Sequence, residues 1–277
     1  MQTINCNGKL LDLSTPRVMG IINVTPDSFY DGGTTISSEA ILKQARKMLS
    51  EGAAILDVGG YSSRPGASTV SEAEELKRVL PAIENILAEF PDTILSIDTF
   101  RAAVAKEAVI KGAAIVNDIS GGRLDDTMYT TVSQLGVPYI LMHMRGTPQT
   151  MAQEAKYEDV TQEVLFYFSE KLTLARQAGI NDIIADPGFC FAKTRQQSFE
   201  LLNQLDQFQN LEIPFLAGIS RKSMVYKTLE STPEEALNGT TALNTIALLK
   251  GASILRVHDV REAVECITLV QNLKSNS

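Results

Sequence analysis

Short apolar runs recur along the chain and are separated by longer segments in which apolar residues return every three or four positions. Five of these runs follow a glycine that ends a helical segment, namely Gly52, Gly112, Gly136, Gly179 and Gly251. Glycine adopts at low cost the left-handed conformation that ends many helices. The runs are apolar nearly throughout, which is typical of strands buried on both faces of a parallel sheet. The pattern therefore predicts repeated strand–helix units.

Three further strands fit this series, at residues 17–24, 93–99 and 215–221, and amphipathic helices are predicted over 38–50 and 71–90. Eight strands alternating with about eight helices predict an α/β protein, a (β/α)8 TIM barrel. A short N-terminal β-hairpin around Asn7-Gly8, at about residues 2–14, is expected to precede the barrel. No linker divides the chain, so we expect a single domain over residues 1–277. The alternative is an open doubly wound sheet, which the lack of a G-x-G-x-x-G motif after any strand disfavours.

The charge balance limits the classes of partner. The chain has 33 acidic and 25 basic residues and a formal net charge of −8. This predicts no binding to nucleic acid and none to an anionic membrane surface, although it allows a local basic pocket. No stretch approaches the ~20 apolar residues of a membrane span, and the first residues do not resemble a secretory signal. We therefore expect a cytoplasmic protein.

Cysteine and histidine usage limits the metal chemistry. The three cysteines, Cys6, Cys190 and Cys266, lie far apart and have no C-x-x-C spacing, which argues against a disulfide framework or a structural zinc site. His143 and His258 are too few for a histidine-rich metal site. Any metal would be a hard cation bound through oxygen ligands.

A polar or charged side chain stands at the carboxyl end of every predicted strand. In chain order these are Asn23, Asp57, Asp98, Asn117, His143, Asp186, the run Ser220-Arg221-Lys222, and Arg256 with His258. In a (β/α)8 barrel the active site lies at this end of the strands. Any single residue of the set could simply cap the following helix. Its recurrence at all the strands indicates an active site.

The chemistry of these residues suggests two kinds of ligand group. Asp98, Asn117 and Asp186 suit a flat heterocycle with an amide or guanidine-like edge. Four cationic candidates suit an anionic leaving group: Arg64, Lys222, Arg256 and His258. The last two strands of this fold commonly build a phosphate site. A simpler alternative for Arg256 and His258 is a salt bridge to Asp259 or Glu262.

Two predicted loops are candidates for lids over this end of the barrel. Residues 25–33 and 61–69 are rich in Gly, Ser, Thr and Pro, and each segment carries an aromatic residue, Phe29 or Tyr61. Loops longer than a tight turn are often functional.

The motifs together resemble a known family. "MGIINVTPDSFYDGG", "ILDVGGYSSRPGA", "SIDT", "VNDIS", "LMHM", "DPGF", "GISRKSM" and "LRVHDV" follow one another in the order and spacing of dihydropteroate synthase, over about residues 17–260. No single motif is decisive, but the whole set is specific. The resemblance implies a transferase of folate biosynthesis that condenses 6-hydroxymethyl-7,8-dihydropterin diphosphate with 4-aminobenzoate (p-aminobenzoate), releasing diphosphate. It also implies inhibition by sulfonamides, a Mg²⁺ cofactor and a homodimer.

The resemblance also implies residue roles. The pterin site would comprise Asp98, Asn117, Ile119, Met142, Asp186, Lys222 and Arg256. The 4-aminobenzoate site would comprise Phe29, Ser63, Arg64, Pro65, Phe191, Lys222 and Ser223. The diphosphate site would comprise Asn23, Arg64, Arg256 and His258, with Asn23 as the Mg²⁺ ligand. The catalytic group would be Asp98, Lys222, Arg256 and His258, acting in an SN1-like loss of diphosphate followed by attack of the arylamine.

Some positions depart from the family pattern. Tyr61 stands where many members carry an acidic or small residue, and Ser63 where threonine is frequent. Cys190 and Ala192 stand where glycines are common. These changes border the 4-aminobenzoate side, and the role of His143 is open, with support of the loop after its strand as the default.

Three other functions compete with the synthase. A corrinoid methyltransferase acting on methyltetrahydrofolate shares the pterin-binding acids, but its substrate has no diphosphate to require the cationic loops. A Schiff-base aldolase would use Lys222 as nucleophile. A pterin-binding module without catalysis would not need every charged strand end.

Overall fold

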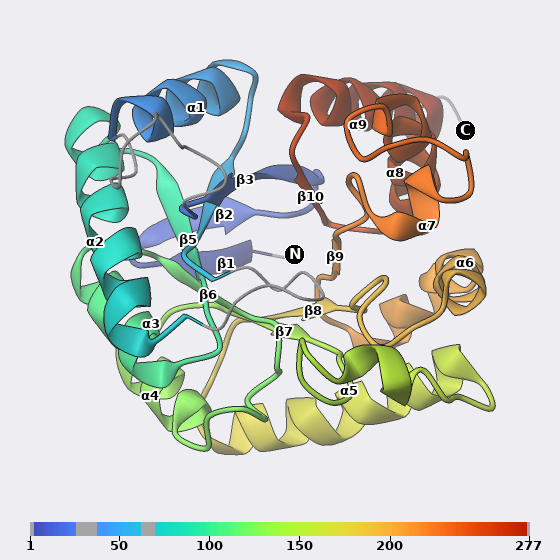
Figure 1. Ribbon diagram of the computed structural model, residues 1–277, viewed down its shortest axis with the longest axis horizontal. Coiled ribbons are helices and arrows are strands. Elements are labelled where there is room, and N and C mark those ends of the chain that lie inside the picture. The colour runs from blue at the N-terminus through green and yellow to red at the C-terminus, as the bar shows by residue number, and fades with distance from the viewer. Residues whose placement is uncertain (1–2, 26–37, 62–69, 276–277) are drawn as a thin grey trace.

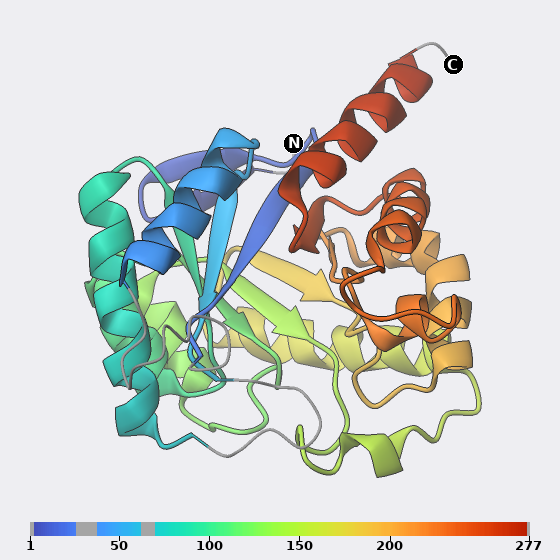
Figure 2. The same ribbon diagram turned by 45° about the horizontal axis from the view of Figure 1, so that its top comes forward.

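The computed structural model describes residues 3–25, 38–61 and 70–275, and within them eight parallel strands form a nearly closed barrel surrounded by helices (Figures 1 and 2). The strands are β3 (Arg17–Asn23), β4 (Ile55–Gly59), β5 (Ile94–Asp98), β6 (Ile115–Asp118), β7 (Tyr139–Met142), β8 (Ile183–Asp186), β9 (Leu216–Ala217) and β10 (Ile254–Val257). Their order in the sheet is β8-β7-β6-β5-β4-β3-β10-β9. A bridge between Ala185 and Phe215 joins the two ends of this order. The predicted barrel is confirmed.

Helices follow the strands and cover the outside of the barrel (Figure 1). The α-helices are α1 (Ser38–Ser50), α2 (Glu72–Glu89), α3 (Ala102–Ile110), α4 (Met128–Leu135), α5 (Val160–Gln177), α6 (Arg195–Asn203), α7 (Ser223–Tyr226), α8 (Leu237–Leu249) and α9 (Val260–Ser275). Two 3₁₀ helices, η2 (Met151–Glu154) and η3 (Leu205–Leu211), lie in the connections. Side-chain caps fix several of the helix starts, such as the reciprocal capping box of Thr194 and Gln197 on α6.

The turn residues adopt the conformations that the sequence predicts. All five glycines placed before strands have positive φ, from 64° at Gly136 to 107° at Gly112. Asn7 and Gly8 also have positive φ, 52° and 87°, which is the requirement of the tight turn that joins β1 (Thr3–Cys6) to β2 (Lys9–Asp12). The predicted hairpin is therefore confirmed.

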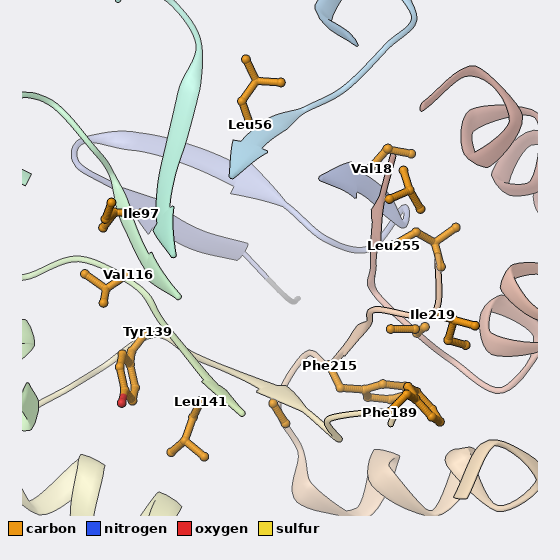
Figure 3. Close-up of a cluster of buried hydrophobic side chains, with 14 of the residues drawn as sticks. Val18, Leu56, Ile97, Val116, Tyr139, Leu141, Phe189, Phe215, Ile219 and Leu255 are labelled. Carbon is orange, nitrogen blue, oxygen red and sulfur yellow. The ribbon is translucent and has the colours of Figure 1, made fainter. Parts of the chain in front are cut away.

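Alternate residues of each strand point out of the barrel and into it. The outward residues, which include Leu56, Ile97 and Leu255, pack under the helices in the main apolar core (Figure 3). The inward residues nearest the strand starts are also apolar, for example Ile55, Ile140 and Ile254. They pack against the hairpin, which thereby closes the N-terminal end of the barrel.

The next inward positions of five strands are polar, because the strand period of two places Asp57, Ser96, Asn117, Asp186 and Arg256 two residues beyond the apolar positions Ile55, Ile94, Ile115, Ile184 and Ile254. The side of the barrel that bears chemistry is thus its C-terminal end. None of the helices in the described ranges has both the length and the apolar character that a membrane crossing requires.

Candidate active site

The guanidinium of Arg256 lies between two carboxylates at the centre of the site. Its Nε donates to Asp57 Oδ2 at 2.6 Å, and its Nη2 donates to Asp98 Oδ2 at 2.6 Å. Asn117 Nδ2 donates to the same Asp57 oxygen at 2.9 Å. Four strands, β4, β5, β6 and β10, therefore meet in one hydrogen-bonded network. The bond to Asp57 uses one of the two N–H donors of the Asn117 amide, so its second N–H and its Oδ1 are the groups that it can offer to a ligand.

Burial and charge act in opposite directions on this network. The pKa of Asp98 is raised to about 7. Burial is the main cause, Arg256 acts to lower the pKa, and the Asp57 carboxylate adds to the rise. For Arg256, burial acts to lower the pKa, but the two carboxylates outweigh it and raise the pKa above its usual value. Arg256 therefore stays charged, and its positive charge is largely balanced by its partners. It can polarise a bound ring without presenting a bare cation.

Asp186 and Lys222 form a second charged group, at the ends of β8 and β9 on the other side of the barrel from Asp57 and Asp98. A Cβ built on Gly218 would lie 3.6 Å from Lys222 Nζ and 3.9 Å from Asp186 Oδ2, so the two side chains approach across this glycine. Asp186 Oδ1 accepts from the Gly188 amide at 2.8 Å. Burial raises the pKa of Asp186, and the nearby Lys222 ammonium opposes that rise. The second carboxylate oxygen remains available to a ligand with N–H donors.

Lys222 also contacts the segment after β8. Its Nζ donates to Phe189 O at 2.9 Å and lies 4.7 Å from the centre of the Phe191 ring. Burial lowers the pKa of Lys222, while Asp186 raises it. Lys222 and Phe191, two of the seven residues that the family resemblance places on the 4-aminobenzoate side, are therefore in contact.

His258 is held by the hydroxyl of Ser220, in the turn that follows the neighbouring strand β9. Ser220 Oγ lies 3.0 Å from His258 Nδ1 and accepts from the His258 backbone amide at 3.2 Å. Asp259 is paired with Arg221, through contacts of 2.5 and 3.0 Å. The salt bridge considered between Asp259 and Arg256 is therefore not formed, and Arg256 faces the interior of the barrel.

The apolar wall of the site is a separate cluster. Ile119 and Met142 are buried together with Met144, Met151 and Ala192, and Phe100 and Phe191 pack against them. Ile119 and Met142, which are expected in the pterin site, thus share one cluster with Phe191, which is expected in the 4-aminobenzoate site. Ser223 is the first residue of α7 and directly follows Lys222.

Cys190 and Ala192 both have left-handed backbone, with φ of 67° and 47°. This is the physical reason why glycine suits these positions, since a side chain there costs about 1–2 kcal/mol. We expect Cys190→Gly to stabilise the protein by about 0.5–1 kcal/mol and to raise Tm by about 1–3 °C. Ala192→Gly is expected to be nearly neutral, because it also removes a buried methyl worth about 0.8 kcal/mol.

Thermal unfolding of both variants measures this prediction. The matched control is Ala178→Gly, at a right-handed position with φ of −71°, where glycine only adds freedom to the unfolded chain and lowers stability. A decrease in the Tm of Cys190→Gly as large as that of the control would contradict the strain argument.

Asn23 is the expected magnesium ligand, and it ends β3 half-buried. Its side-chain amide has no hydrogen-bond partner within residues 3–25, 38–61 and 70–275. The described residues contain no cluster of three or more His, Cys, Asp or Glu that could hold a metal. Mg²⁺ commonly takes one or two protein oxygens and completes its shell with water and substrate phosphates. A single amide oxygen beside the expected diphosphate site therefore fits this ion.

Four expected site residues, Phe29, Ser63, Arg64 and Pro65, lie outside the described residues. Tyr61, which directly precedes residues 62–69, accepts a hydrogen bond from Gln149 Nε2 at 2.8 Å. Its ring meets Phe100 edge-on at 5.1 Å between centroids. Tyr61 stands where many family members carry an acidic or small residue. Its longer side chain links the ends of β4 and β5 to the loop after β7.

Two buried residues were missed or left without a role by sequence reasoning. Asp57 was recognised only as a strand end, but it is fully buried and accepts from both Arg256 and Asn117. Lys193 was not singled out, yet its Nζ lies 2.8 Å from His143 Nδ1 in the interior. Period-two alternation in "ILDVG" could have pointed to Asp57. Nothing in the sequence distinguishes Lys193 from a surface lysine.

A (β/α)8 barrel with facing carboxylates and cations at its C-terminal end has the polar groups that a flat, nitrogen-rich ring would need. Residues 19–258 match the family model described as pterin binding enzyme. The chain therefore belongs to the pterin-binding enzyme family.

Relatives of known identity narrow this class to transferases of one kind. Dihydropteroate synthase of Escherichia coli is 45% identical over 270 residues, which cover 95% of this chain and 94% of the relative. A Yersinia pestis dihydropteroate synthase solved with a sulfonamide drug has a TM-score of 0.93 at 41% identity, covering 99% of this chain and 100% of that one. A Xanthomonas albilineans dihydropteroate synthase with 4-aminobenzoic acid has a TM-score of 0.92 at 40% identity, covering 99% and 98%. Within its family this chain groups with the dihydropteroate synthases, and the corrinoid methyltransferase, aldolase and non-catalytic alternatives lose their support.

Proposed function

We propose that this chain condenses 6-hydroxymethyl-7,8-dihydropterin diphosphate with 4-aminobenzoate to give 7,8-dihydropteroate and diphosphate, as a step of folate biosynthesis. The observation that carries the proposal is the Arg256 guanidinium held between Asp57 and Asp98, opposite the Asp186–Lys222 pair. A planar pterin offers ring nitrogens and an amino group to these carboxylates, and a π-face to the guanidinium. The family membership supports the same reaction.

The pterin would be oriented before any bond breaks. Asn117 donates one amide N–H to Asp57, and it would offer its oxygen to a ring N–H. Asp186 offers its second oxygen to the amino-pyrimidinone edge, and Lys222 donates to a ring acceptor. Ile119 and Met142 exclude water from the ring, which strengthens these polar contacts.

Loss of diphosphate would be the first chemical step. Arg256 and His258 project from alternate positions at the end of β10 and would bind the departing oxyanions, and Arg64 is expected to add a third cation. The C–O bond breaks as the leaving group takes the electron pair, and the resulting pterin-methyl cation is stabilised by conjugation and by the Asp98 carboxylate. Asn23 would hold Mg²⁺ through its amide oxygen, and the ion when bound would neutralise negative charge on the diphosphate.

Attack by the arylamine would complete the reaction. An aniline nitrogen is neutral near pH 7, so it needs no strong general base and loses its proton after the C–N bond forms. The Lys222 ammonium and the Phe191 ring would receive the carboxylate and the ring of 4-aminobenzoate, together with Ser223 and with Phe29, Ser63, Arg64 and Pro65. Sulfonamides, as flat arylamine analogues, would compete for the same place.

The proposal is tested by measuring diphosphate release from the pterin diphosphate with Mg²⁺, in the presence and absence of 4-aminobenzoate. Release that requires the arylamine and a product with the mass of dihydropteroate is the expected result. Release without arylamine would show that the cleavage site works but that the acceptor site does not. No release in either case would overturn the proposal.

A homodimer is the second part of the proposal. It is supported by α8, which buries polar residues and exposes apolar ones. The buried residues of α8 include polar Thr240 and Asn244, whereas Ile246 and Leu249 are 39% and 47% exposed. An apolar stripe on the outer face of a helix with a partly polar inner face fits a contact with a second copy.

We expect the double substitution Ile246→Glu with Leu249→Glu to weaken the dimer by at least about 100-fold in Kd, because two charges would be buried without partners. Sedimentation equilibrium measures this. The control is Ile110→Glu at the end of α3, an isoleucine that is 62% exposed. Wild-type protein that sediments as a monomer at micromolar concentration, or a double variant that stays dimeric, would count against this interface.

The expected cytoplasmic location also remains a proposal. All three cysteines are free thiols, with Cys6 and Cys266 buried. Burial raises the pKa of Cys6 to about 12, so this thiol stays protonated. Free thiols are the usual state of cysteine in a reducing compartment.

A further inference from the structure

A lysine side chain lies buried beside the site, with no carboxylate as its partner among the described residues. Lys193 is 7% exposed, and its Nζ has three close neighbours. These are Gly188 O at 3.0 Å, Phe191 O at 3.2 Å and His143 Nδ1 at 2.8 Å. An ammonium has three N–H donors, so three acceptors satisfy it completely. Burial lowers the pKa of Lys193 to about 7, and Asp186 opposes this while Lys222 adds to it.

This contact gives His143 a role. The two backbone carbonyls can only accept, and the third ammonium proton is therefore directed to His143 Nδ1, with the ring proton on Nε2. Burial, and the Lys193 charge after it, keep the pKa of His143 well below its usual value. The ring is packed edge-on against Tyr167, at 4.7 Å between centroids, which fixes its orientation. His143 is thus a neutral, immobile acceptor.

The backbone that Lys193 holds has an unusual shape. Three alternate residues, Gly188, Cys190 and Ala192, have left-handed φ of 68°, 67° and 47°. A Cβ at Gly188 would lie 2.1 Å from His143 O, so the segment is pressed against the end of β7. Two bonds of its own amides support this backbone, Phe191 N–H to Gly188 O at 3.1 Å and Cys190 N–H to Ser198 Oγ at 3.2 Å. Lys193 adds a donor to the carbonyls at both ends of the 188–191 segment.

This shape sets the position of the Phe191 ring. Within four residues, the segment presents Phe189 O to Lys222 and the Phe191 ring beneath the same ammonium. The ring also packs against the cluster of Ile119, Met142 and Ala192. Two lysines therefore donate hydrogen bonds to carbonyls of the 188–191 segment, Lys193 from the interior and Lys222 from the proposed substrate side.

We propose that Lys193 is a positioning residue for the arylamine substrate, holding the 188–191 segment through Gly188 O, Phe191 O and His143 so that Phe191 forms the wall of the 4-aminobenzoate pocket. The proposal rests on the proposed function, since that pocket is part of it. Asp98, Asn117 and Arg256, which are proposed to bind the pterin, belong to other strands, and no described hydrogen bond joins them to Lys193. The other charged residues of the proposed pterin site, Asp186 and Lys222, bond the segment at Gly188 N and Phe189 O, whereas Lys193 holds Gly188 O and Phe191 O. Loss of Lys193 should therefore affect one substrate much more than the other.

The test is steady-state kinetics of Lys193→Met, which keeps an unbranched side chain one heavy atom shorter and donates no hydrogen bond. The expected result is a KM for 4-aminobenzoate raised by at least about tenfold, and sulfonamide inhibition weakened in parallel, since two carbonyls and an imidazole lose their donor. The KM for the pterin diphosphate and kcat should stay within about threefold of wild type, since the contacts made in bond cleavage are unchanged. A purely structural role would lower the Tm and the active fraction and leave both KM values unchanged.

His143 variants make the proposal independent of whether Lys193→Met folds well. His143→Gln keeps an acceptor for the ammonium and should retain a KM for 4-aminobenzoate within about threefold of wild type, whereas His143→Leu removes the acceptor and should raise it. Lys106→Met, an exposed lysine on α3, is the matched control. Equal rises in both KM values, or no rise in either, would overturn the positioning role. Wild-type enzyme without synthase activity would instead overturn the proposed function.

Discussion

Lys222→Ala is expected to reduce kcat/KM for both substrates by about 10²–10³-fold, the effect of removing one charged donor from a buried site. Lys222 is the side chain at which the two proposed substrate sites meet. Its Nζ approaches Asp186 across Gly218, donates to Phe189 O and covers the Phe191 ring. Removing it leaves the Asp186 carboxylate without its nearest positive charge, in a place where burial already raises its pKa.

The expected pattern distinguishes Lys222 from Lys193. Lys222→Ala should impair the pterin diphosphate and 4-aminobenzoate alike, while Lys193→Met should impair 4-aminobenzoate alone. Measurement of diphosphate release at varied concentrations of each substrate separates the two patterns. Lys227→Ala removes an exposed ammonium five residues away and serves as the control. Full activity of Lys222→Ala would mean that neither substrate depends on this ammonium.

The barrel could be predicted from the sequence because its signals are local. A glycine in the left-handed conformation ends each of five helical segments, and an apolar run follows each one. The hairpin turn at Asn7-Gly8 is equally local. The order of strands then follows from the right-handed connection of parallel strands, which leaves little freedom in how such units close.

The candidate site could be predicted only in part, because its decisive contacts join residues far apart in the chain. The carboxyl ends of the strands were recognisable as polar, and the structure brings Asp98, Asn117 and Arg256 together. The pairing of Arg256 with Asp57 spans 199 positions, and no local pattern encodes it. For the same reason Lys193 could not be told from an exposed lysine, since its burial depends on the fold of the segment around it.

Cys190 and Ala192 stand where glycines are common in the family. The sequence alone shows this difference but does not give its structural meaning. The missing glycines were visible in "DPGFCFAK". Their meaning required φ angles, which show that both positions are left-handed and that this chain places side chains where they are strained. The strain lies in the segment that Lys193 and Lys222 hold from two sides, which explains how the fold retains it.

Asp57→Asn is expected to reduce kcat/KM by about 100-fold and the free energy of unfolding by about 2–3 kcal/mol. The substitution keeps the size of the side chain but removes the charge that faces Arg256. Asp57 Oδ2 accepts from both Arg256 and Asn117, so an amide in its place can satisfy at most the same two donors with a neutral oxygen. The cost is expected to be lower than for an isolated buried pair, because Asp98 continues to neutralise Arg256.

The catalytic loss from Asp57→Asn should arise from geometry. With only Asp98 as an ionic partner, the guanidinium is free to follow that carboxylate, and both the face offered to the pterin and the orientation of Asn117 become less fixed. Kinetics and urea unfolding of the same preparation measure the two effects, and Asp126→Asn, at an exposed position, is the control. An Asp57→Asn variant with wild-type kcat/KM but reduced stability would show that Asp57 only balances a buried charge. If stability and kcat/KM fall together while the KM for 4-aminobenzoate stays constant, Asp57 positions the pterin half of the site, as Lys193 is proposed to position the other half.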